Sequence, residues 1–209
     1  MKQLRILLIA VLTLLILQTG FSQTIVGSRH DFSTATWNTS VGQQICIVCH
    51  TPHNASTTVT DAPLWNHATT SATFTLYTSS TLNATMGQPD ASSKLCLSCH
   101  DGTVAVENFG TITTGTTYLT GGPLIGTNLK NDHPVSFTYD AALATADIGL
   151  RNPTTAIGIG TGTINATMLF SGKLQCASCH DVHNTSGFTA GLLRKSNAAS
   201  ALCLTCHAK

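Results

Sequence analysis

Charged and aromatic side chains are scarce in this sequence. Its 209 residues include 10 Lys+Arg and 9 Asp+Glu, so that 9% of the chain is charged, and 6% is aromatic. Because no stripe of basic residues is present to neutralise phosphates, we expect no nucleic-acid partner. The shortage of aromatic residues also leaves few large side chains for a core. The length suits one or two ordinary domains.

Long apolar runs are also rare, and the only one stands at the N-terminus. Two basic residues precede the apolar run Ile6–Leu17, and the small-residue sequence Gly20–Ser22 follows it. This order predicts a secretory signal peptide over residues 1–22, with Gln23 as the first mature residue. The run is shorter than the ~20 apolar residues that span a bilayer. We therefore expect an exported chain without membrane insertion.

Cysteine, by contrast, is frequent, and each pair of cysteines is followed directly by histidine. The four Cys-x-x-Cys-His motifs are Cys46, Cys49 and His50; Cys96, Cys99 and His100; Cys176, Cys179 and His180; and Cys203, Cys206 and His207. This pattern is the attachment signature of c-type haem, with the histidine as proximal iron ligand. Zinc sites and disulfide frameworks do not require a histidine after every second cysteine. We therefore predict four covalently attached haem c groups.

The remaining histidines predict the opposite axial ligands. Five are left for four irons: His30, His53, His133 and His183 as distal ligands, and His67 in reserve. The alternative ligand is methionine, and beyond the predicted signal peptide the chain has only Met86 and Met168. We therefore expect four bis-histidine haems.

Local sequence constrains some of these distal ligands. His53 and His183 each lie three residues after a proximal histidine, on the same face of a helical turn. Neither can easily reach the far side of that haem, so each is expected to serve a different haem or to remain an exposed, unused histidine. Pro134 biases His133 towards extended backbone. His30 lies near the mature N-terminus and is a candidate ligand for a haem of a neighbouring chain.

The stretches between the motifs predict little regular structure. Segments such as Thr111–Thr117 and Ile157–Thr163 combine β-branched Thr with Gly, which favours short strands and turns. Brief helices are expected around the Cys-x-x-Cys-His motifs and over Ala141–Ile148. The fold class is therefore a haem-cored multihaem cytochrome c, mostly coil with short helices and a few short strands. Residues 23–209 are expected to form one tetrahaem domain.

Several segments resemble the doubled-CXXCH multihaem cytochromes, most closely the tetrahaem extracellular nanowire subunits of the outer-membrane cytochrome E type. The segments that carry the resemblance are Arg29–Ser33, Val48–His53, Ala62–His67, Leu95–Gly102, His133–Phe137 and Leu202–His207. The resemblance implies subunits joined head to tail in an open polymer. It also implies a continuous haem chain and one axial histidine donated between subunits.

These inferences predict electron conduction outside the cell, with no catalysis. An iron with both axial positions filled has no place for a substrate, so the partners expected are redox donors, extracellular acceptors and other copies of the chain. The alternatives are a monomeric periplasmic tetrahaem shuttle and, less favoured, a multihaem reductase with one open iron. Asp101 and Asp181 follow proximal histidines directly. They are candidates for tuning the potential or are plain surface acids.

Overall fold

Short helices and loops make up most of this chain. The computed structural model describes residues 25–188 and 190–208, so the predicted signal peptide lies outside the described part. The α-helices are α2 (Ala91–His100), α3 (Ala141–Ala146), α4 (Ile164–Thr167), α5 (Cys176–Cys179) and α6 (Cys203–Cys206). The strands are β1 (Phe137–Thr138) and β2 (Lys173–Leu174). The 3-10 turns are η1 (Phe32–Thr34), η2 (Thr36–Val41), η3 (Cys46–Val48), η4 (Ala190–Leu192) and η5 (Ala198–Ser200). The prediction of a mostly coil chain is confirmed.

All the α-helices except α4 form where the sequence predicts them. Three of the Cys-x-x-Cys-His motifs lie on α2, α5 and α6, and the first begins on η3. The helix expected over Ala141–Ile148 is present as α3, where the carboxylate of Asp140 accepts a hydrogen bond from Leu143 N at 2.8 Å and caps the first turn. The longest helix, α2, has 10 residues. In the described part of the chain, no helix has both the length and the apolar content to cross a membrane.

The strands, however, do not form in the Thr- and Gly-rich segments. β1 and β2 form one antiparallel pair, with Phe137 opposite Leu174. In Thr111–Thr117, the backbone N–H groups of Thr116 and Thr117 donate to the Glu107 carboxylate at 2.7 and 2.8 Å. In Ile157–Thr163, the ends meet in a single isolated bridge. The prediction of strands there was wrong because a carboxylate and a tight local turn satisfy backbone groups that a partner strand would otherwise bind.

The apolar side chains gather in two clusters of unequal size. The larger cluster is built from Phe137, Tyr139, Leu143, Ile164, Met168, Leu174 and Leu202. The smaller cluster is built from Phe74, Leu97 and Leu129. Both candidate methionine ligands pack in or against the larger cluster, where Met168 is 1% exposed. This packing uses the two methionines as core side chains.

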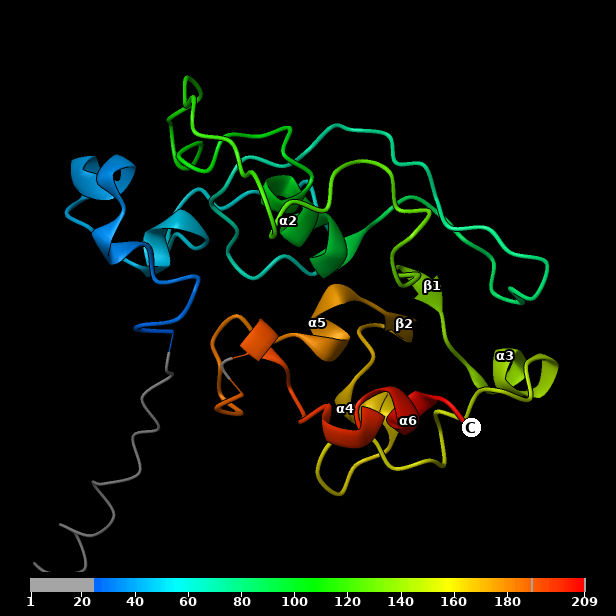
Figure 1. The fold of residues 1–209 in the computed structure, drawn as a ribbon. Coiled ribbons are helices and arrows are strands. Elements are labelled where there is room, and N and C mark those ends of the chain that lie inside the picture. Colours follow the sequence, from blue (N-terminus) through cyan, green and yellow to red (C-terminus); the bar gives the residue numbers. More distant parts are fainter. Residues whose placement is uncertain (1–24, 189, 209) are drawn as a thin grey trace, which may run out of the picture.

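The four motifs follow one another through the molecule in sequence order. In Figure 1 they run from η3 (cyan) past α2 (green) and α5 (orange) to α6 (red). Helices α2 and α5 contact each other. The strand pair β1–β2 joins the segment after His133 to the segment before Cys176. The fold therefore sets motif-bearing segments side by side, although up to 80 residues of sequence separate consecutive motifs.

Candidate functional site

Each Cys-x-x-Cys-His motif is one helical turn that ends at its histidine. The histidine N–H donates to the carbonyl of the first cysteine, at 2.8 Å for His50, 3.0 Å for His180 and 3.0 Å for His207. In α2 the same turn is the end of a longer helix. Residues three and four apart share one face of such a turn. The two cysteines and the histidine of a motif therefore lie on one face of the turn, from which all three can contact the same haem.

Backbone carbonyls orient three of the four proximal rings. The Nδ1 atoms lie 2.6 Å from Pro63 O for His50, 2.7 Å from Pro123 O for His100 and 2.6 Å from Gly191 O for His180. Since a carbonyl only accepts, Nδ1 carries the proton and Nε2 presents its lone pair. This is the arrangement in which an imidazole binds a metal through Nε2.

Each of three proximal histidines has a second histidine at a defined distance. The ring centroids are 6.1 Å apart for His50 and His183, 6.1 Å for His100 and His30, and 6.3 Å for His207 and His133. A metal–imidazole bond is about 2.0 Å long and the ring centre lies about 1.1 Å beyond the nitrogen, so two imidazoles across one metal have centroids about 6.2 Å apart. The residues present therefore fit bis-histidine haem iron at three positions.

The distal rings are suited to bind as neutral imidazoles. Burial, and secondarily the neighbouring His100, lowers the pKa of His30 to about 4, so this ring is neutral at pH 7. The Nδ1 of His133 lies 2.9 Å from Pro134 O, which again leaves Nε2 for a metal. His183 Nδ1 is 3.7 Å from the Asp181 carboxylate. These three histidines have the chemistry that an axial ligand requires.

The remaining proximal histidine is His180 of the third motif. Within residues 25–188 and 190–208 no second histidine ring lies at such a distance from it. Of the two remaining histidines, His53 is exposed and makes no ring contact with another histidine among these residues. His67 is 2% exposed, and its Nε2 lies 3.6 Å from Cys99 Sγ. His67 therefore packs against the second motif, and the structure places neither histidine against His180.

Consecutive motifs bring their cysteines together. Burial, and secondarily the Cys49 thiol, raises the pKa of Cys99 to about 12. The Cys96 and Cys176 thiols lie close enough to interact, and so do the Cys206 and Cys179 thiols, which sets the second motif beside the third and the third beside the fourth. Each motif thus neighbours the next, as a relay of redox centres requires.

The two acids that follow proximal histidines have different surroundings. Asp101 is 5% exposed, and its Oδ1 accepts from Thr103 N at 2.7 Å and from Thr103 Oγ1 at 2.8 Å. Its Oδ2 is buried and accepts no hydrogen bond in the described structure. Both oxygens of Asp181 accept hydrogen bonds, one from His183 and the other from Thr185. Burial acts to raise the pKa of Asp181, but these hydrogen bonds outweigh it and lower the pKa.

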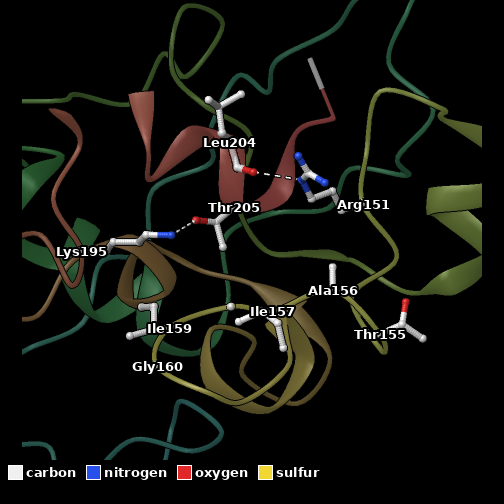
Figure 2. A pocket seen from close by; sticks show the side chains of 10 residues that line it. Arg151, Thr155, Ala156, Ile157, Ile159, Gly160, Lys195, Leu204 and Thr205 are labelled. Atoms are coloured by element: carbon white, nitrogen blue, oxygen red, sulfur yellow. Dashed lines mark hydrogen bonds between the residues drawn. The ribbon is translucent and has the colours of Figure 1, made fainter. Parts of the chain in front are cut away.

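A cavity of about 630 Å³ lies behind the fourth motif (Figure 2). Its wall includes Leu204 and Thr205, the two residues between the motif's cysteines, and no cysteine or histidine. Arg151 Nε donates to Leu204 O at 3.0 Å, and Lys195 Nζ donates to Thr205 Oγ1 at 2.8 Å. The cavity therefore borders α6 without contacting its cysteines or histidine, and Arg151 and Lys195 hydrogen-bond to this turn.

Sequence reasoning missed the groups that support the ligands. The carbonyls of Pro63, Pro123 and Gly191 carry no side-chain signal, although two of them belong to prolines. It also missed Gln175, a buried amide directly before Cys176. The only signal for Gln175 in the sequence was a polar residue next to a motif. Its partners could not be predicted, because Ser93, Ser136 and Asp90 lie far away in sequence.

One comparison with known proteins bears on this site. Residues 169–209 match the family model described as "Doubled CXXCH motif", and this segment contains the third and fourth motifs. No curated protein matches the chain. The match, together with two further motifs of the same form, supports a multihaem c-type cytochrome that carries covalently attached haem and transfers electrons.

Proposed function

We propose that this protein is a tetrahaem electron carrier in which the irons are bis-histidine ligated. The observation that carries the proposal is the set of three histidine pairs at 6.1, 6.1 and 6.3 Å, each joining a motif histidine to a histidine from elsewhere in the chain. Filled axial positions leave no room for a substrate at these irons. Electron transfer without catalysis is therefore the function that the site supports best.

Covalent haem supplies a reversible one-electron iron couple at each motif. The chain's own residues would hold and orient it: the motif cysteines would anchor the group, the backbone carbonyls would keep the proton on Nδ1 of the motif histidines, and the distal histidines would supply the second ligands. His183, which follows the third motif, lies against His50 of the first. A ligand shared in this way would hold the first and third motifs close, which favours rapid electron transfer between them.

We further propose that copies of the chain join head to tail outside the cell, through His53 and His180, for which the described residues provide no second histidine ring. The candidate for the shared ligand moves from His30 to His53, because the ring of His30 lies against His100 of its own chain. His53 and His180 are both exposed. If His53 of one subunit completes the site of His180 in the next, the contact is heterologous and can repeat without closing.

Replacing His53 by alanine tests the shared ligand. We expect four haems to remain attached, since every motif is intact, and filaments to be lost in negative-stain electron microscopy of the haem-loaded protein. A matched control is Asn54→Ala, the next residue of the same exposed segment, which should leave filaments intact. Single particles of wild type at every concentration would instead support a monomeric periplasmic shuttle.

The same open position is the observation that favours a reductase. If His180 has no second ligand in the working protein, one iron of four can bind a small molecule. A carbon monoxide spectrum of the reduced wild-type protein, without any treatment that separates its subunits, distinguishes the two functions. In a carrier no haem should bind carbon monoxide and change its absorption spectrum, whereas in a reductase one haem should do so.

Angles between the ring planes yield an expected electron paramagnetic resonance spectrum. The planes differ by 15° for His50 and His183 and by 74° for His133 and His207. Nearly parallel imidazoles split the iron orbitals that receive their π density, whereas nearly perpendicular imidazoles leave these orbitals close in energy. The oxidised protein is therefore expected to show a rhombic low-spin signal from the His50–His183 haem and a strongly anisotropic low-spin signal from the His133–His207 haem, beside the signals of the other two haems. His133→Ala should remove the anisotropic signal and keep the rhombic one, and loss of the rhombic signal instead would contradict the assignment.

A further inference from the structure

A single buried amide ties together three segments that lead to haem ligands. Gln175 is 1% exposed. Its Oε1 accepts from Ser93 Oγ at 2.5 Å and from Ser136 Oγ at 3.0 Å. Its Nε2 donates to Asp90 Oδ1 at 2.8 Å, and Lys173 forms an ion pair with the other oxygen of that carboxylate. We call Gln175, Ser93, Ser136, Asp90 and Lys173 the amide hub.

The members of the amide hub stand close to ligands in sequence. Gln175 directly precedes Cys176, and Ser93 lies three residues before Cys96 on the same helix. Ser136 lies three residues after His133. The hub therefore joins the second motif, the third motif and the distal ligand of the fourth.

The hydrogen bonds that join α2 directly to the start of α5 involve the same atoms of Ser93 and Gln175. Ser93 Oγ, which donates to Gln175, also accepts from Cys176 N at 3.0 Å. Gln175 N donates to Ser178 Oγ at 2.9 Å, so the first turn of α5 is fixed to the same residue. A shift of α5 against α2 would break several of these bonds at once.

The energetics of burial make this arrangement stiff. A buried amide or hydroxyl without a hydrogen-bond partner is costly, so the network is stable only when all its members are in place. Ser136 also has a φ of +62°, a left-handed conformation that side chains rarely adopt. Its hydroxyl bonds to Gln175, and it accepts from Asp90 N at 3.0 Å. The hub therefore holds a strained residue next to a ligand loop.

We propose that Gln175 is a positioning residue that sets the orientation of the second-motif haem relative to the third, through its buried hydrogen bonds to Ser93 and Ser136 and its part-buried hydrogen bond to Asp90. The proposal rests on the proposed function, since it presupposes haem at both motifs. Gln175 would influence electron transfer between the two haems only through their orientation. Its amide hydrogen-bonds to serines and to a carboxylate, and not to an axial ligand.

Gln175→Leu tests this role because it keeps the volume and removes both hydrogen-bonding groups. Haem number is counted by mass spectrometry, and axial ligation is read from the low-spin absorption spectrum. The decisive readout is circular dichroism in the Soret band, where coupling between neighbouring haems depends on their mutual orientation. We expect four haems and unchanged low-spin absorption, with the coupled dichroism signal losing most of its amplitude or changing sign.

Gln88→Leu is the matched control. The Gln88 side chain also makes two hydrogen bonds, to Phe74 N at 2.8 Å and to Phe74 O at 3.0 Å, but it joins no two motifs. It should leave the dichroism unchanged. If Gln175→Leu does not fold, Ser93→Ala provides the test. This variant removes one hydroxyl from the amide hub and is expected to halve the amplitude of the Soret dichroism that arises from haem coupling.

The outcomes separate the two proposals. Wild type without attached haem would overturn the proposed function. Wild type with four attached haems, combined with an unchanged Soret couplet in both hub variants, would overturn the role of Gln175 alone.

Discussion

Replacing His30 by alanine is expected to open one iron of a single subunit while all four haems stay attached. The ring of His30 lies 6.1 Å from that of His100 in the same chain, and the pKa of about 4 keeps it neutral and ready to bind. Since the covalent links come from the cysteines alone, haem number should not change. The haem held by His100 should become high-spin and bind carbon monoxide.

The measurement is a carbon monoxide titration of protein dispersed to single subunits. Wild type should show one reactive haem, at His180, and His30→Ala should show two. His53→Ala is the control, because in dispersed subunits this residue has no neighbouring iron to serve, and the count should remain one. If His30→Ala instead left the count unchanged and abolished only filaments, His30 would be the ligand shared between subunits.

Replacing Asp101 by asparagine is expected to raise the reduction potential of one haem. The Asp101 carboxylate is buried directly after His100, and its Oδ2 accepts no hydrogen bond in the described structure. A buried negative charge stabilises the ferric state over the ferrous state, since the ferric iron carries one more positive charge. As a general scale, two unit charges about 8 Å apart interact by about 2 kcal/mol at an effective dielectric constant of about 20. For a one-electron couple this corresponds to a rise on the order of 90 mV.

Spectroelectrochemical titration measures this shift, and Asp181→Asn is the matched control. Asp181 occupies the same position after the third motif, but both of its oxygens accept hydrogen bonds and it is more exposed. Solvent and hydrogen bonds screen its charge, so the control should move its haem by much less. Equal shifts in both variants would show that burial of Asp101 does not determine the potential.

Local features of the chain could be predicted because local chemistry decides them. A Cys-x-x-Cys-His motif needs one helical turn, and each of the four motifs forms such a turn. The Ala-rich segment after Asp140 forms α3 with that residue as its cap. The Thr- and Gly-rich segments were harder to predict, because a strand needs a partner. Glu107 takes the backbone donors that a partner strand would have bound.

Local sequence could not predict which distal histidine lies opposite which motif histidine. Spacing places His183 on the same side as His180, which argues for a different haem but does not say which one. Only the folded chain puts it 6.1 Å from His50. The position of His30 near the predicted mature N-terminus suggested a neighbouring subunit, yet the described structure places its ring against His100 of the same chain.

The sequence alone was sufficient to predict the four attachment motifs, the candidate proximal and distal histidines and the mostly coil character of the chain, of which the structure confirms the last. These properties follow from residue type and from spacings within one turn. Tertiary structure alone decided which histidines oppose each other, which acid is buried and how Gln175 links α2 to α5. Such contacts join residues far apart in sequence, so they depend on how the whole chain closes around its buried polar and apolar groups.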